Sequence, residues 1–130
     1  MAAASPQRLL FNRAQRLKQS REFARVRQAG RRLVHGCLIA NWQTLPAGSP
    51  TRLGVVTSGK IGNAVVRSRA RRLLRETFRL HQHELTQPLD LILVARNSIV
   101  GRALADVEKD FLTTVRRAGL LNDGRMKKAE

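Results

Sequence analysis

Residues 62–79 read GNAVVRSRARRLLRETFR, a stretch with six arginines and one acid in which apolar residues recur at regular intervals. A helix turns by about 100° per residue, and at that period the apolar residues of this stretch fall into one narrow stripe. The stripe consists of Val66, Ala70, Leu73, Thr77 and Leu80, with Leu74 on its flank. Asn63 is the expected N-cap, because its short side chain can accept hydrogen bonds from the free amides of the first turn. The stretch therefore predicts an amphipathic helix that is fastened to a core along one side.

The other side of this predicted helix carries one sign of charge. Its members are Arg67, Arg71, Arg72, Arg75 and Arg79, with Ser68 among them and with Arg69 and Glu76 on the border. Like charges four residues apart destabilise an isolated helix by roughly 0.2–0.5 kcal/mol per pair. A solvated face is the ordinary explanation of a charge run, but such a face normally mixes signs. A bound polyanion would convert the repulsion into binding free energy, and the planar fork of arginine grips phosphate through two hydrogen bonds.

The charge of the whole chain also favours an anionic partner. The 130 residues carry a net charge of +16, and the excess is uneven. Residues 1–79 hold 17 Lys and Arg against 2 Asp and Glu, whereas residues 80–130 hold 8 against 7. A basic half joined to a nearly neutral half indicates a binding surface on a scaffold. Nucleic acid is the leading partner, and the rival, an anionic membrane, is disfavoured because the sequence contains no long apolar run.

The cysteine content and the N-terminal sequence bear on the compartment. A single Cys37 excludes an internal disulfide and a cysteine metal cage. Residues 1–18 contain too short an apolar segment for a signal peptide. We therefore expect the protein in the reducing cytoplasm.

The remaining elements follow from periodicity and from glycine and proline breakers. They are a helix at 20–29, strands at 33–45, 53–58 and 87–96, and a last helix at 102–121. Gly36 interrupts the first strand as a candidate bulge, and the turn at 46–51 joins the first two strands into an expected hairpin. The order of elements indicates an α+β fold, a small mixed sheet packed with helices.

The length fits one domain around one hydrophobic core. Residues 16–121 are expected to form a single RNA-binding α+β domain. Residues 1–15 have arginines without a settled period and are expected to form a flexible basic arm. Residues 122–130 are expected to be a frayed polar tail.

Candidate catalytic groups are sparse in the sequence. His81, His83 and Glu84 lie close together, but no second ligand cluster accompanies them, so capping or solvation explains them better than a metal site. The acids Asp106, Glu108 and Asp110 have a spacing that scatters them around a helix. Ser58 has no evident base, and the GKIG segment lacks the pattern of a phosphate-binding loop. The sequence therefore predicts no catalytic residue and no metal site, and favours a binding protein over a self-sufficient enzyme.

One known family shares the arginine-rich segment. Residues 58–79 closely resemble the signature S-K-K-x-G-N-A-V-x-R-N-R-x-K-R-x-x-R-E of the bacterial ribonuclease P protein component. The matching residues are Lys60, Gly62, Asn63, Ala64, Val65, Arg67, Arg69, Arg72, Arg75 and Glu76. Arg16, Leu17, Lys18 and Phe23 resemble the opening R-L-K-x-x-x-x-F of that family, and residues 90–96 resemble its late strand. The resemblance spans roughly residues 16–120.

The resemblance implies a fold in the order α-β-β-β-α-β-α with a left-handed crossover through the arginine helix, as in ribosomal protein S5 domain 2-like proteins. One further strand is then expected before that helix, either by a split of residues 33–45 at Gly36 or after the second strand. The implied function is that of the protein subunit of ribonuclease P, which binds the catalytic RNA and the 5′ leader of precursor tRNA. The implied chemistry is Mg²⁺-dependent cleavage by the RNA, with Mg²⁺ held by the RNA and the substrate, in a complex of one protein and one RNA. The alternative is a structural ribosomal protein that binds rRNA.

The resemblance also implies two groups of binding residues. Contacts with the catalytic RNA are expected from Lys60, Arg67, Ser68, Arg69, Arg71, Arg72 and Arg75. Contacts with the leader are expected from Arg16, Lys18, Phe23, Asn41 and Trp42. Ser68 replaces the asparagine of the signature, and Gly59 replaces a basic residue. An ordinary core role is the alternative for Phe23, and Asn41 or Trp42 stands where relatives carry a strand aromatic.

Overall fold

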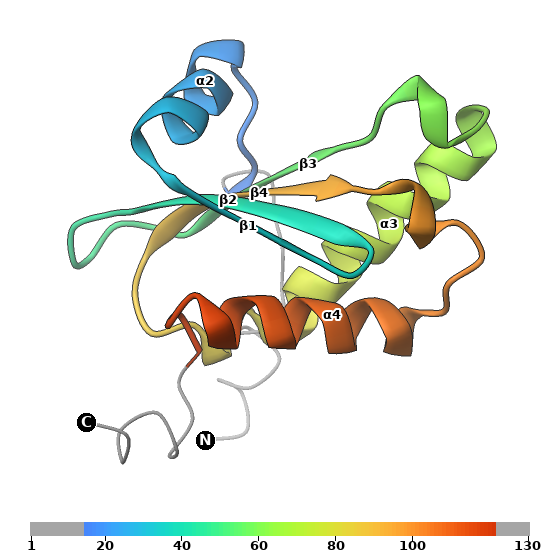
Figure 1. The fold of residues 1–130 in the computed structure, drawn as a ribbon. Coiled ribbons are helices and arrows are strands. Elements are labelled where there is room, and N and C mark those ends of the chain that lie inside the picture. The colour runs from blue at the N-terminus through green and yellow to red at the C-terminus, as the bar shows by residue number, and fades with distance from the viewer. Residues whose placement is uncertain (1–14, 122–130) are drawn as a thin grey trace.

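A computed structural model describes residues 15–121 of the chain (Figure 1). The expected tail at 122–130, and the expected arm at 1–15 apart from Gln15, lie outside the described residues. The helices and strands are α2 (Ser20–Ala29), β1 (Arg31–His35), β2 (Leu38–Thr44), β3 (Arg52–Val56), α3 (Ala64–His81), β4 (Leu89–Ala95) and α4 (Leu104–Arg117). Single 3₁₀ turns lie at η2 (Gly59–Ile61), η3 (Gln82–Glu84) and η4 (Asn97–Ile99). This order is the one that the resemblance implies.

The four strands form one sheet in the order β1-β2-β4-β3. The expected hairpin between residues 33–45 and 53–58 is wrong, because β4 lies between β2 and β3. Residues 33–45 instead split into β1 and β2, which pair with each other as the hairpin. Gly36 makes the split possible, since its φ of 58° lies in the left-handed region that favours glycine.

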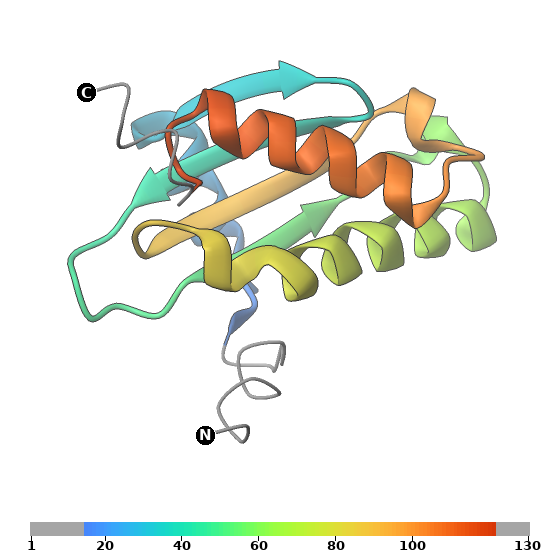
Figure 2. The same ribbon diagram turned by 90° about the horizontal axis from the view of Figure 1, so that it is seen from below.

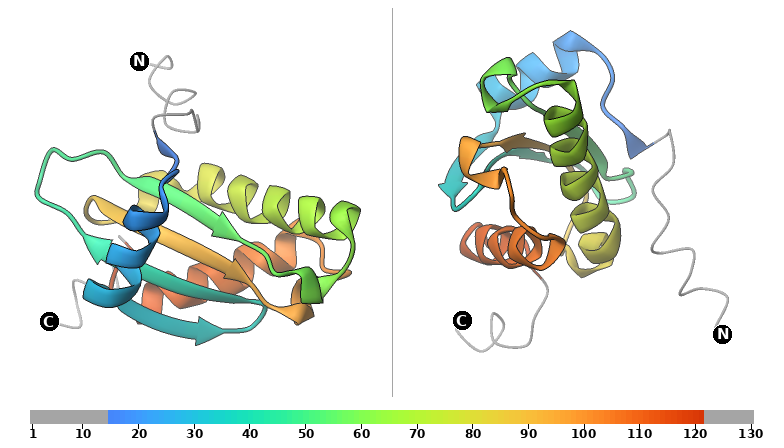
Figure 3. Two further views of the ribbon diagram at one scale, coloured as in Figure 1. Left: turned by 90° about the horizontal axis from the view of Figure 1, so that it is seen from above. Right: turned by 90° about the vertical axis from the view of Figure 1, so that its right-hand side faces the viewer.

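The β3-α3-β4 unit makes a left-handed crossover. Its two strands are neighbours and run parallel. In the left view of Figure 3, α2 faces the viewer, both strands run rightward, β4 lies below β3 and α3 passes behind the sheet. Figure 2 shows the same unit from the opposite side, with α3 in front. About 98% of such connections are right-handed, so this crossover is an exception, and the resemblance implied it.

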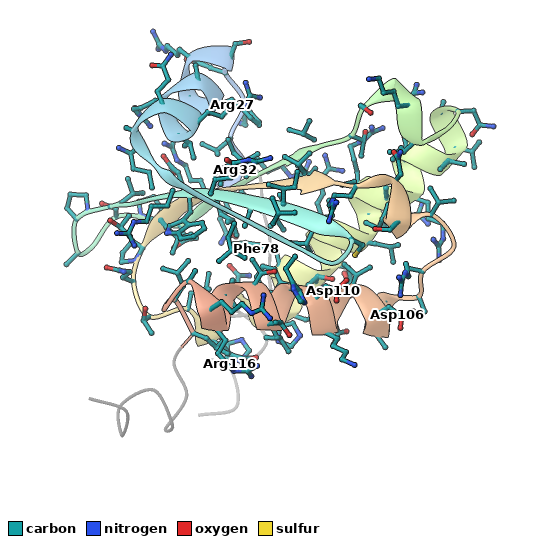
Figure 4. The ribbon with its side chains drawn as sticks, in the orientation of Figure 1. Arg27, Arg32, Phe78, Asp106, Asp110 and Arg116 are labelled. Atoms are coloured by element: carbon teal, nitrogen blue, oxygen red, sulfur yellow. The ribbon has the colours of Figure 1, made fainter. Side chains whose placement is uncertain are left out.

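Helices cover the two faces of the sheet unequally. Helices α3 and α4 lie on one face, and the short α2 crosses the other (Figure 1). The larger core lies between the sheet and the helix pair, where Phe78 and Phe111 are fully buried. Figure 4 shows Phe78 between the sheet and α4. A smaller cluster of Leu17, Val26 and Ile92 lies beneath α2. Much of the α2 face therefore stays free of helical cover.

The buried stripe of α3 is rotated from the expected one. Its buried residues are Ala70, Leu74, Thr77 and Phe78. Leu74, expected on the flank, is fully buried, whereas Leu73 and Leu80 are half-buried. Phe78 accounts for the rotation, because its large ring fills the core and draws that side of the helix inward. The expected N-cap is confirmed, since Asn63 Oδ1 accepts from the Val66 amide at 3.1 Å.

A charged network fastens α2 to the sheet. The Asp90 carboxylate is fully buried and accepts from Arg52 at 2.9 Å through both Nε and Nη2. Arg25 of α2 donates to the same carboxylate at 3.1 Å, and Arg52 Nη1 also donates to Glu22 of α2 at 2.9 Å. A buried carboxylate is tolerated only when it is paired and hydrogen-bonded. This pairing fixes the position of α2 over the sheet.

Replacement of Phe78 by alanine tests the rotated stripe. We expect Phe78→Ala to lower the free energy of unfolding by about 3–5 kcal/mol, as for other fully buried aromatics. The matched variant Leu80→Ala should cost clearly less, because Leu80 is only half-buried. Urea denaturation of the two variants gives the comparison. Equal losses would mean that the stripe is centred where the periodicity alone put it.

Candidate nucleic-acid interface

The outer side of α3 presents arginines without acidic neighbours. Arg69 and Arg72 are exposed, and Arg67, Arg71 and Arg75 are half-buried. Within residues 15–121, no carboxylate lies within ion-pair distance of any of these five guanidinium groups. The face is therefore uncompensated in charge, as the sequence predicted.

Backbone and hydroxyl oxygens hold three of these arginines in place. Arg67 Nη1 donates to the Gly62 carbonyl at 2.8 Å, and Arg71 Nη1 donates to Thr57 Oγ1 at 2.8 Å. Arg69 Nη2 donates to the Arg102 carbonyl at 2.9 Å. A guanidinium group has five N–H donors, so a single such bond orients the group and leaves most donors for a ligand.

The charges on this face repel one another. Burial lowers the pKa of the Arg75 guanidinium from its ordinary value, and the charges of Arg16 and Arg71 lower it further. A bound anion would relieve that repulsion. Arg75 also lines a groove of about 400 Å³ whose other lining residues are Arg16, Ser68, Arg72, Glu76 and Arg79. Arg16, expected to contact the leader, therefore lies beside the arginine helix.

The one acid of this face is already neutralised. Glu76 Oε2 accepts from Arg79 Nη2 at 2.6 Å and Glu76 Oε1 accepts from Arg79 Nε at 3.0 Å. The side-chain hydrogen bonds from Arg79 lower the pKa of the Glu76 carboxyl. Glu76 could also have paired with Arg72 four residues earlier, but its partner is Arg79.

The loop before α3 adds one exposed cation. Lys60 is exposed in η2, and Ser58 caps that turn by accepting from the Lys60 amide at 3.2 Å. Gly62 then enters α3 with a φ of 151°, and a Cβ at this position would lie 2.9 Å from the Val66 side chain. Only glycine permits this close approach. Ser68 is exposed and lines the same groove as Arg72 and Arg75.

The α2 face of the sheet brings together a second set of expected residues. Phe23 is half-buried and packs with the cluster of Leu17, Val26 and Ile92. Its ring lies directly over Gly54, where a Cβ would come within 2.5 Å of Phe23 Cζ. Asn41 lies opposite Ile92 across the β2–β4 pair, so it faces the same side, although only 7% of it is exposed. Lys18 is exposed just before α2.

Trp42 is not part of this set. Side chains alternate between the two faces of a strand, so Trp42 points away from the side that Asn41 faces. Its ring is 5% exposed and belongs to the core beneath α3 and α4. The leader contact expected of Trp42 therefore has no exposed ring to support it.

Sequence reasoning missed several residues of the α2 face. Val56 and Val94 pack beside the α2 cluster and stay half-buried. Gly54 was also missed, although its absent side chain makes room for Phe23. The alternation of side chains along residues 53–56 and 91–95 could have indicated which of these residues share a face. The side that each residue faces depends on strand register, and the register depends on the unexpected position of β4.

The candidate catalytic groups are bound to separate structural partners. His81 lies between Glu84 at 2.7 Å and Glu108 at 3.3 Å, where it connects the end of α3 to α4. Asp106 accepts from the Ala103 amide at 3.1 Å and thereby caps α4. Asp110 accepts from the Cys37 amide at 2.9 Å and thereby fixes the β1–β2 turn. Figure 4 shows Asp106 and Asp110 apart along α4.

Cys37 is unsuited to act as a nucleophile. It is 1% exposed, and burial together with the neighbouring Asp110 raises the pKa of its thiol to about 12. The reactive form of cysteine is the thiolate. Among residues 15–121, no three His, Cys, Asp or Glu side chains converge as metal ligands would. None of the helices in that range is long and apolar enough to cross a bilayer.

Comparison with known proteins gives consistent results. The family model described as Ribonuclease P matches residues 11–119. The ribonuclease P protein component of Gluconacetobacter diazotrophicus is 38% identical over 114 residues, which cover 85% of this chain and 97% of that protein. The corresponding protein of Clostridium novyi is 32% identical and covers 83% of this chain and 96% of its own length.

Solved structures show the same fold. The RNase P protein of Staphylococcus aureus superposes with a TM-score of 0.76 at 24% identity, and the match covers 85% of this chain and all of that one. The protein of Thermotoga maritima superposes with a TM-score of 0.70 at 23% identity over 78% of this chain and 96% of its own. Because the family model spans most of the described domain and the relatives match over nearly their whole length, the chain belongs to the ribonuclease P protein family.

Proposed function

We propose that this ribonuclease P subunit binds the catalytic RNA through the arginine face of α3. The observation that carries the proposal is the set of five guanidinium groups that point outward without a carboxylate partner among residues 15–121. Counterion release makes phosphate binding to such a face favourable and dependent on salt. Ser68 and Arg16 join this face through the groove at Arg75, and Lys60 adds an exposed cation in the loop before α3.

The acids of the domain support this proposal. Every carboxylate within residues 15–121 is hydrogen-bonded to a group outside the five arginines, with His81 shared by two acids and Arg52 by two others. The acids are Glu22, Glu76, Glu84, Asp90, Asp106, Glu108 and Asp110. A phosphate backbone is the partner whose chemistry matches what remains exposed.

The leader of precursor tRNA is the proposed ligand of the α2 face. Phe23 offers a half-buried ring, and stacking on such a ring is worth roughly 1–3 kcal/mol per base. Asn41 supplies a polar group on the same side of the sheet, and Lys18 supplies a cation beside α2. The half-buried Val56 and Val94 give the bases an apolar floor.

Cleavage is assigned to the RNA in this proposal. Mg²⁺ would be held by the RNA and the substrate, where it would supply the activation of water for hydrolysis of the phosphodiester. The residues of this chain neutralise phosphates, orient the leader and hold the RNA in shape, which lowers the Mg²⁺ concentration that the RNA needs. The proposal further includes one protein per RNA and a cytoplasmic location. Family membership favours this function over that of a ribosomal protein.

Processing of a precursor tRNA tests the function as a whole. The purified chain, mixed with its cognate RNA at low Mg²⁺, should stimulate release of the 5′ leader, as gel analysis of labelled substrate would show. The chain without RNA should release nothing. Cleavage by the chain alone would reassign the chemistry to the protein, and an absence of stimulation would favour the ribosomal alternative.

A triple substitution tests the arginine face. We expect Arg67→Ala, Arg71→Ala and Arg75→Ala together to weaken RNA binding and to reduce the slope of log K against log salt by about 0.7–0.9 for each phosphate that the variant no longer binds. The melting temperature should hold, because relief of repulsion offsets the removal of two hydrogen bonds. The matched control removes three charges from α4 through Lys109→Ala, Arg116→Ala and Arg117→Ala. If both triple variants bind RNA equally weakly, only net charge matters and α3 has no special role.

Replacement of Phe23 tests the leader contact. Phe23→Ala should weaken binding of leader-bearing precursor tRNA to the holoenzyme about tenfold, within the range for one stacked base. Affinity for mature tRNA should stay unchanged. The control Phe23→Leu keeps most of the packing against Gly54 but removes the aromatic face. A parallel loss of affinity for precursor and mature tRNA would show that Phe23 is an ordinary core residue.

A further inference from the structure

Two exposed valines lie together beside the arginine face. Three large apolar residues within 15–121 are exposed: Val65 by 77%, Val100 by 50% and Val34 by 40%. Val65 lies in the first turn of α3, and Val100 follows η4 in the connection between β4 and α4. Both line one groove of about 250 Å³, whereas Val34 lies elsewhere, on β1.

The floor of this groove is apolar and its rim is cationic. It is lined by Val65, Val66, Arg69, Ala70, Ile99, Val100 and Gly101, and is called the valine groove below. Figures 1 and 2 show the start of α3 and the connection after β4 side by side. Arg69 is the one charged lining residue, so an apolar group can enter without desolvating a carboxylate.

Hydrogen bonds to backbone carbonyls hold Arg69 and the nearby Arg102 in place. Arg69 Nη2 donates to the Arg102 carbonyl at 2.9 Å, and Arg102 Nε donates to the Ser98 carbonyl at 3.1 Å. Neither guanidinium group has a carboxylate within ion-pair distance among the described residues. Arg69 therefore connects the valine groove to the arginine face, and it stays free to bind an anion.

A ligand of the valine groove must suit both its apolar floor and its cationic rim. An unpaired nucleotide has an apolar planar base and an anionic phosphate, and RNA-binding proteins use such a pair of surfaces to hold unstacked bases. A second copy of this chain would bring an equal set of arginines to the rim, and like charges in such an interface disfavour it. Charge complementarity thus selects a nucleotide.

We propose that the valine groove takes up one unpaired base of the catalytic RNA, with the adjoining phosphate bound to Arg69. This inference rests on the proposed function, since it requires α3 to face the RNA. It adds a contact that reads RNA shape, because only a nucleotide outside a helix can insert its base. Burial of Val65 and Val100 then stabilises the complex without any change in charge.

The test separates the apolar contact from the ionic one. The variant Val65→Ser with Val100→Ser should bind the ribonuclease P RNA about tenfold more weakly, because less apolar surface is buried, while the slope of log K against log salt stays that of the wild type. Arg69→Ala should weaken binding and also flatten the slope. The matched control Val34→Ser, at an exposed valine outside the groove, should leave affinity unchanged. Val100→Ser alone, in a loop, serves if the double variant melts at a lower temperature.

Chemical probing of the RNA gives a second readout. Wild-type protein should protect the base edge of an unpaired nucleotide, and the double valine variant should lack that protection while backbone protections from hydroxyl radical persist. Wild-type affinity of the double variant would overturn the inference, as would weaker binding with a flattened salt slope. If the wild-type protein without RNA sedimented as a dimer and the double variant as a monomer, the groove would bind a second copy of the chain, and the inference would be overturned too. The arginine triple variant reports on the proposed function separately, so the two failures are distinguishable.

Discussion

The packing of α3 into the core is the interaction on which the rest of the structure depends. Leu74 and Phe78 are fully buried against the sheet and α4, and their burial holds an 18-residue helix that carries six arginines. Full burial of one such side chain contributes about 1.5–3 kcal/mol, whereas each like-charge pair costs roughly 0.2–0.5 kcal/mol. The core thus outweighs the repulsion. The same stripe sets the rotation of the helix, and that rotation turns the arginines toward solvent.

The sheet separates two tasks because its side chains alternate. Ala40 and Trp42 point into the large core, while Asn41 between them faces α2. Strand β4 lies inside the sheet and pairs with both β2 and β3. The registers of these two pairs decide which side chains share each face of the sheet. Asp90 of β4, buried on the α2 side, binds Arg52 and thereby connects the position of α2 to those registers. The position of Phe23 on α2 is consequently tied to the sheet by these hydrogen bonds.

The sequence predicted what depends on local spacing and missed what depends on long-range pairing. The amphipathic helix, its Asn63 cap and the grouping of arginines on one side of it all follow from residues within four positions of one another. The hairpin between the first two predicted strands was wrong because no local signal places β4 between β2 and β3. The strand count and the crossover came from the family resemblance and not from periodicity. Local spacing also could not tell on which face of its strand Trp42 lies, since a bulge or split at Gly36 decides which face each later residue of the strand occupies.

The near-neutral composition of residues 80–130 has a structural cause. In this half Asp90 neutralises Arg52, Glu108 contacts His81, and Asp110 binds the Cys37 amide. These acids are bound at contacts between helices, strands and turns, so they do not pair with the arginines of α3, although residues 80–130 pack with residues 15–79 into one domain. The effective field at the arginine face is therefore stronger than a net charge of +16 spread evenly over the surface would give. Long-range attraction of a polyanion to clustered charge speeds encounter and orients it before close contact forms.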